Sequence, residues 1–205
     1  MSAKKIDKPT AKANGTSDVQ VRSFTDQRAW ASWLASNHAA SPGVWLKLAK
    51  RASGATSVTY PEAVEVALAW GWIDGQKKGH DDASWLQKFT PRAKRSIWSK
   101  INREKALVLI AAGKMNPAGL AEVQCAKRDG RWEAAYDPPS RASVPEDLAA
   151  ALTAKPRAAA FFATLDSRNR YAVLFRIQNA KKAETRARRI AQFVAMFVKR
   201  EKLYP

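Results

Sequence analysis

Residues 90–103 hold the densest group of side chains in the sequence that could bind an anion. The guanidinium group of an arginine such as Arg92 binds two carboxylate or phosphate oxygens at once, and Ser99 and Asn102 add further polar groups. A helix that begins here also offers free backbone N–H groups. Trp98 provides an aromatic face against which a planar ligand can stack. The segment therefore predicts an anion-binding surface.

A second basic group occupies residues 181–189, at the start of the last predicted helix. Arg186 and Arg189 are three residues apart, so a helix presents both on one side. That side lies beside an apolar stripe, so the two arginines can turn inward toward an acid or outward toward a ligand. We expect this group and residues 92–103 to meet in the fold as one site that binds an anion.

Asp74 lies in the sequence Gly-Trp-Ile-Asp-Gly-Gln, between the candidate ligand contacts Trp72 and Gln76. At the end of a strand, partial burial would favour the protonated carboxyl group and suit Asp74 to acid–base chemistry. The same carboxylate can instead pair with an arginine or cap a turn. We favour this second interpretation and place Asp74 between or beneath the two basic groups.

The eight tryptophans are unusually many for 205 residues. Three of them, Trp72, Trp85 and Trp98, fit a core position and a ligand-binding position equally well. Aromatic residues interleaved with basic ones are also typical of proteins that bind single-stranded nucleic acid. The remaining five are expected in the core: Trp30, Trp33, Trp45, Trp70 and Trp132.

Most familiar catalytic and cofactor motifs do not occur in the sequence. It has no nucleophile elbow, phosphate-binding loop or dinucleotide-binding glycine motif. Its two histidines and one cysteine, Cys125, cannot form the usual zinc-binding sets, and a single cysteine excludes an internal disulfide framework. We therefore expect no metal and no cofactor, and favour a binding protein over an enzyme.

The net charge of +18, from 36 basic and 18 acidic residues, is distributed unevenly. Residues 84–105 and residues 181–202 each carry a net charge of +6, whereas residues 18–83 are neutral. Two clusters that meet in the fold would focus a positive potential and attract anions. The alternative is that each cluster is simply the solvated face of a helix.

The pattern of apolar and turn residues predicts a helix-rich α+β fold, with a small antiparallel sheet in the first two-thirds of the chain and a helical C-terminal part. We divide the chain into a disordered basic tail (1–17), an α+β region (18–137) and a helical region (138–205), with the two regions packed as one globular unit. Strands are expected at 44–49, 72–74, 85–89 and 132–136. Helices are expected at 25–38, 59–70, from 96 or 99 to 112, and at 116–129, 145–154, 156–165, 168–179 and 181–200.

The sequence resembles the YdeI/OmpD-associated family of bacteriocin-protection proteins. The stretches that carry the resemblance occur in the family's order and extend over most of the chain: 62–68, 71–76, 89–92, 96–102, 115–119, 132–136 and 180–190. The resemblance implies a role in bacteriocin protection or stress tolerance and supplies no catalytic residues. Its signature includes Asp74, Arg92, Trp98, Ser99, Asn102, Arg186 and Arg189.

We therefore expect a non-enzymatic cytoplasmic protein with an anionic ligand or a protein partner. The chain has no apolar run long enough to span a bilayer, and residues 1–17 have no apolar segment typical of a secretory signal. Two other functions stay open, namely nucleic-acid binding by basic and tryptophan residues, and a small-molecule enzyme with Asp74 as acid or base. The oligomeric state is left open.

Overall fold

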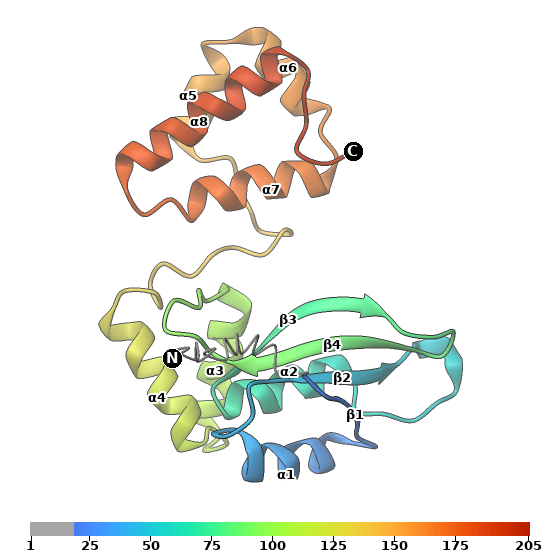
Figure 1. Cartoon of the computed structure of the whole chain (residues 1–205). Coiled ribbons are helices and arrows are strands. Elements are labelled where there is room, and N and C mark those ends of the chain that lie inside the picture. Colours follow the sequence, from blue (N-terminus) through green and yellow to red (C-terminus); the bar gives the residue numbers. More distant parts are fainter. Residues whose placement is uncertain (1–18) are drawn as a thin grey trace, which may run out of the picture.

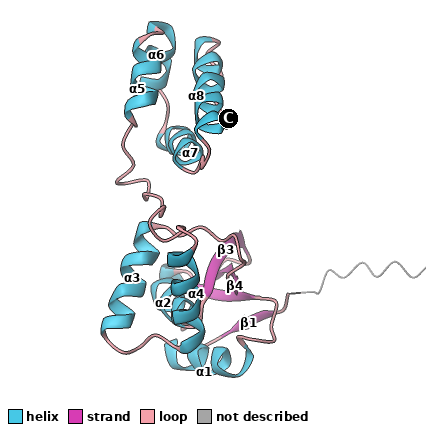
Figure 2. Ribbon diagram, turned by 90° about the vertical axis from the view of Figure 1, so that its left-hand side faces the viewer, coloured by secondary structure: helices cyan, strands magenta, loops and turns pink. Residues whose placement is uncertain are grey.

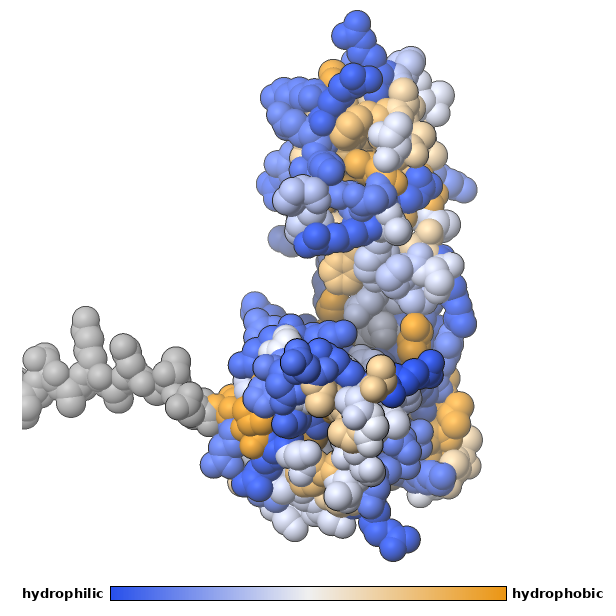
Figure 3. Space-filling view, turned by 90° about the vertical axis from the view of Figure 1, so that its right-hand side faces the viewer, coloured by the Kyte–Doolittle hydropathy of each residue, from blue (hydrophilic) through white to orange (hydrophobic). Residues whose placement is uncertain are grey.

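The structure is a computed structural model that describes residues 19–205, so the expected tail at 1–17 lies outside it. The described chain forms two hydrophobic cores, one within residues 30–135 and one within residues 148–197. We call residues 19–135 the N-terminal body, residues 136–141 the connecting segment and residues 142–205 the C-terminal body. Figure 1 shows the two bodies as separate folded parts, and the space-filling view in Figure 3 shows hydrophilic residues over much of both. The described residues thus have two hydrophobic cores, whereas the sequence suggests one packed unit.

The N-terminal body combines a four-stranded sheet with four α-helices. Its strands follow the order β1-β2-β4-β3, in which β1 pairs with β2 in parallel and the other neighbours are antiparallel. The sheet is therefore mixed rather than wholly antiparallel as predicted. The elements are β1 (Val21–Ser23), α1 (Gln27–Asn37), β2 (Val44–Ala49), α2 (Tyr60–Ala69), β3 (Trp72–Gly79), β4 (Ser84–Pro91), α3 (Lys100–Ala111) and α4 (Pro117–Arg128).

Local sequence signals explain where α2 begins and ends. The backbone N–H of Thr59 donates to the carboxylate of Glu62 at 2.8 Å, which completes a capping box at the first turn. Two residues after the helix, Gly71 adopts a φ of 73°, a left-handed conformation that disfavours other residues. This turn leads directly into β3, which returns alongside α2 and carries Asp74.

Two local predictions need correction. Helix α1 begins at Gln27 and not at residue 25, because the carboxylate of Asp26 accepts the backbone N–H of Ala29 at 2.8 Å and caps the helix. Residues 132–136 form turns instead of a strand, and only Tyr136 makes an isolated bridge, to Ser99. The aromatic residues that suggest a strand there serve packing, since Trp132 is buried against Trp98.

The C-terminal body contains four helices that surround the second core. Figure 2 shows them on the far side of the extended connecting segment from the helices of the N-terminal body. Phenylalanine rings dominate the centre, where Phe197 is fully buried and contacts Phe161, Phe162 and Phe193. The helices are α5 (Glu146–Thr153), α6 (Pro156–Ala163), α7 (Ser167–Gln178) and α8 (Ala183–Val198).

Candidate functional site

Arg92 lies just beyond the end of β4 and points into the N-terminal body. Its backbone N–H donates to the carbonyl oxygen of Gly71 at 3.0 Å, which fixes the start of the side chain. The residue is only 7% exposed, and its guanidinium carbon lies 3.6 Å from the ring centroid of Trp98. Burial lowers the pKa of Arg92 to about 10, because the charged form loses its hydration.

The side chains of Arg92 and Trp98, which we call the donor cluster, hold buried N–H groups that nothing accepts. One guanidinium nitrogen, Nη1, donates to the carbonyl oxygen of Ile97 at 3.3 Å. By contrast, Nε and Nη2 of Arg92 and Nε1 of Trp98 have no hydrogen-bond partner in the described part of the chain. Buried donors are nearly always satisfied in folded proteins, so three in one place indicate an acceptor from outside the chain.

The neighbouring backbone holds Trp98 firmly in place. Its carbonyl oxygen accepts the N–H of Tyr136 at 3.0 Å, and the carbonyl oxygen of Tyr136 accepts the N–H of Lys100 at 2.9 Å. The ring of Trp132 packs against Trp98 with centroids 4.9 Å apart. Arg131, which is 4% exposed, donates to the carbonyl oxygen of Ser96 at 2.8 Å. These contacts fix the position of Trp98 within the N-terminal body.

Asp74 and two tyrosines extend the polar groups beside the donor cluster. The hydroxyl of Tyr60 donates to the carboxylate of Asp74 at 2.8 Å. Burial raises the pKa of Tyr60, and the hydrogen bond to Asp74 adds to the effect. Burial also raises the pKa of Tyr136, and the charge of Asp74 acts in the same direction. Both phenols stay protonated at neutral pH, so they serve as hydrogen-bond donors rather than as bases.

Charges close to Arg92 leave it only partly compensated. The negative charges of Glu122 and Asp74 favour its ionised form, whereas the positive charge of Arg131 opposes it. Neither acid is close enough to Arg92 to form an ion pair in the described chain. Motif spacing gave no signal for Glu122, Arg131 or Tyr60, because their sequence neighbours carry no recognisable site pattern. Tyr136 had one signal, its place in a stretch that resembles the family.

The other predicted residues of the N-terminal body have different surroundings. Ser99 caps α3, and its hydroxyl accepts the backbone N–H of Asn102 at 3.1 Å. Trp72 is 1% exposed and its indole N–H donates to the carbonyl oxygen of His38, so it is a core residue and not a ligand contact. Gln76 is exposed, at a register shift in β3. Of the predicted set, Asp74, Arg92, Trp98 and Ser99 lie around Tyr136.

Arg186 and Arg189 do not join this group. Both belong to α8 in the C-terminal body, where their guanidinium groups donate to backbone carbonyl oxygens near the end of α7. Arg186 also forms a bidentate ion pair with Asp147 at the start of α5, at 2.5 and 2.8 Å. Arginines that bind the last carbonyl groups of a helix stabilise its negative end. These signature residues therefore hold α5, α7 and α8 together, and the expected two-part site does not form.

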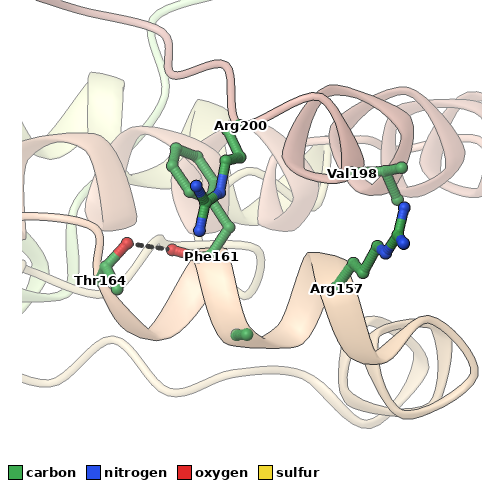
Figure 4. A pocket seen from close by; sticks show the side chains of 6 residues that line it. Arg157, Phe161, Thr164, Val198 and Arg200 are labelled. Carbon is green, nitrogen blue, oxygen red and sulfur yellow. Dashed lines mark hydrogen bonds between the residues drawn. The ribbon is translucent and has the colours of Figure 1, made fainter.

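A pocket of 680 Å³ lies in the C-terminal body, between α6 and the end of α8. Figure 4 shows Arg200 beside the ring of Phe161, while Arg157 extends toward Val198. Both arginines are solvent-exposed, so the pocket offers positive charge without the buried donors of Arg92. Within residues 19–205, no group of three or more His, Cys, Asp or Glu side chains is placed to hold a metal ion.

Comparison with known protein families finds different matches in the two bodies. Residues 141–199 match the family model described as "Bacteriocin-protection, YdeI or OmpD-Associated" (OmdA). The C-terminal body is an OmdA domain. Residues 22–122 match a different model, described as a "Domain of unknown function (DUF8412)". No curated protein and no solved structure matched the chain.

The OmdA domain includes Arg186 and Arg189 but none of the donor cluster. Of the stretches on which the family resemblance rests, only residues 180–190 fall within it, and the stretches from 62 to 119 fall within the other family model. Within residues 19–205, no helix is both long and apolar enough to cross a bilayer.

Proposed function

We propose that this chain is a binding protein whose N-terminal body captures the anionic group of a small ligand at the donor cluster. The three unpartnered donor nitrogens of Arg92 and Trp98 carry this proposal. A carboxylate, sulfate or phosphate oxygen accepts such hydrogen bonds and also compensates the buried positive charge. Because Arg92 is only 7% exposed, the site suits one small anionic group rather than a large surface.

The match of residues 141–199 suggests the setting in which this binding acts. We infer a cytoplasmic protein without catalytic activity that contributes to bacteriocin protection or stress tolerance, since the family model is described by bacteriocin protection. In this proposal the OmdA domain supplies the link to that role, and the N-terminal body supplies the ligand site.

Thermal unfolding of the full chain in sodium acetate, sulfate or phosphate, at an ionic strength held constant with sodium chloride, tests the proposal. An anion that binds the folded state raises the melting temperature as its concentration rises above Kd. We expect at least one of the three anions to do so. Trp98→Phe keeps the aromatic packing but removes one unpartnered N–H, so its shift should be smaller.

Trp72→Phe is the matched control, because the indole N–H of Trp72 already has an acceptor within the chain. This variant should unfold at a lower temperature but keep the full anion-induced shift. The proposal is wrong if no anion raises the melting temperature above that in sodium chloride alone, or if both variants show the same anion-induced shift as the wild type. An internal water molecule would then be the acceptor for the donor cluster.

A further inference from the structure

One face of the sheet packs on the core and the other does not. Side chains alternate along β2, where Val44, Leu46 and Leu48 are buried and Trp45 and Lys47 are partly exposed. The pairing Trp45↔Lys88 and Lys47↔Leu86 puts these four residues on the same face. Across β4, Lys78 pairs with Leu86 and joins them. We call these five residues the outer sheet face.

The helices of the N-terminal body lie on the opposite side of the sheet, as Figure 2 shows for α2, α3 and α4. The first hydrophobic core contains the inward residues of β2 and Phe89 of β4 but none of the outer sheet face. Leu86 is nevertheless only 3% exposed, between Lys47 and Lys78 in the strand register. The alkyl parts of lysine side chains commonly cover apolar residues in this way.

Two ammonium groups of the outer sheet face converge on Trp45. The Nζ atom of Lys78 lies 4.3 Å from the ring centroid of Trp45, and that of Lys88 lies 5.8 Å from it. Lys47 is paired with Asp81 at 3.2 Å, but neither Lys78 nor Lys88 has an acidic partner among residues 19–205. Like charges on neighbouring strands repel, and an anion close to both would relieve that repulsion.

We propose that the outer sheet face binds single-stranded nucleic acid, with one base stacked on Trp45 and phosphates bound by Lys78 and Lys88. Each lysine ammonium group over the ring moves to a phosphate when the base takes its place. A sheet face with an aromatic residue among basic ones suits an unpaired base, whose π face is free, better than a duplex. The face has one aromatic ring among lysines, so it lacks the apolar groups that insert into a membrane.

This binding goes beyond the anion site, because it uses neither Arg92 nor Trp98. Titration of fluorescently labelled oligo(U) and oligo(dT) of 12 nucleotides with the full chain, read by anisotropy at several salt concentrations, tests it. Trp45→Ala should weaken binding by about tenfold or more, while Trp45→Phe, which keeps an aromatic ring, weakens it less. Lys78→Gln should reduce the slope of log K against log salt by about 0.7, the value for one phosphate contact to a single strand.

The double variant Lys155→Gln/Lys199→Gln is the matched control for Lys78→Gln/Lys88→Gln. Both pairs lower the net charge equally, but Lys155 and Lys199 are exposed in the C-terminal body. The control and Trp98→Phe should bind the oligonucleotides like the wild type. If both double variants lost affinity for the oligonucleotides equally, the proposal would be overturned, since net charge alone would then explain binding. Absence of binding at about 50 mM salt, or equal affinity for duplex DNA or for anionic vesicles, would also overturn it.

Discussion

The two bodies use arginine in opposite ways, although each contains a 22-residue segment with the same net charge of +6. In the C-terminal body, Arg186 and Arg189 find acceptors on α7, and Arg186 also binds Asp147. In the N-terminal body, Arg92 is more deeply buried, but two of its guanidinium nitrogens have no acceptor. The charge of the two segments therefore does not distinguish them, whereas the unsatisfied buried donors of Arg92 do.

The largest expected effect comes from Gly119→Ala, which disturbs the N-terminal body alone. A Cβ atom at Gly119 would lie 2.4 Å from the carbonyl oxygen of Ala69, so α2 and α4 would have to separate. We expect a loss of about 3 kcal/mol, at the upper end for overpacking, because the contact is with backbone. Calorimetry should show this loss as a lower melting temperature for one of two transitions, with the transition of the C-terminal body unchanged.

Gly79→Ala is the control for that substitution, since nothing lies within 4 Å of the added Cβ atom. It should leave both transitions nearly unchanged. If Gly119→Ala instead showed a single transition at a lower temperature, the two cores would unfold together. The two bodies would then not be independent.

A smaller effect is expected from Arg186→Ala, which removes the link between α5, α7 and α8. The loss should be about 2 kcal/mol, because hydrogen bonds to a charged group are lost along with an ion pair that is partly exposed. Arg188→Ala is the control, since Arg188 is exposed and has no side-chain hydrogen bond within the described residues. Urea unfolding should give a lower free energy of unfolding for Arg186→Ala than for Arg188→Ala. Equal stability of the two variants would refute a structural role for Arg186.

The smallest effect concerns pH. The hydrogen bond from Arg186 lowers the pKa of Asp147 below its ordinary value of 3.8. Since the folded pKa lies below the unfolded one, this stabilisation is present above about pH 4 and is lost as pH falls through the folded pKa. The side chain of Asp147 is 45% exposed, so we expect less than about 1 kcal/mol.

Thermal unfolding of the wild type and Asp147→Asn between pH 7 and pH 2.5 measures this contribution. The stability difference between them should narrow below about pH 4. A constant difference over the whole range would mean that the ion pair adds nothing beyond packing.

The sequence predicts most of the fold because the signals for its elements are local. The alternation in residues 44–49 gives β2 with the observed bounds, and the Thr59 and Glu62 pair marks the start of α2. The strand β1 has three exposed residues and therefore no apolar pattern that could reveal it. Residues 132–136 mislead because aromatic residues favour a strand locally, whereas here they fill a space beside Trp98.

The candidate site is only partly predictable because its members meet through tertiary contacts. The residue types of Arg92 and Trp98 predict a shared site, and the two side chains lie together. The pairing of Tyr60 with Asp74 depends on how α2 packs beside β3, which no spacing in the sequence encodes. Whether Arg186 faces a ligand or a helix end likewise depends on where α7 ends.

The connecting segment contacts both bodies through two neighbouring residues, Tyr136 and Asp137. Tyr136 is bonded through its backbone to the carbonyl oxygen of Trp98, and its ring packs against Phe175 of α7 at 4.9 Å. The next residue, Asp137, binds Lys100 on one side and Gln178 on the other. Two consecutive residues of this short stretch therefore contact both bodies, which restricts how freely one body can turn relative to the other.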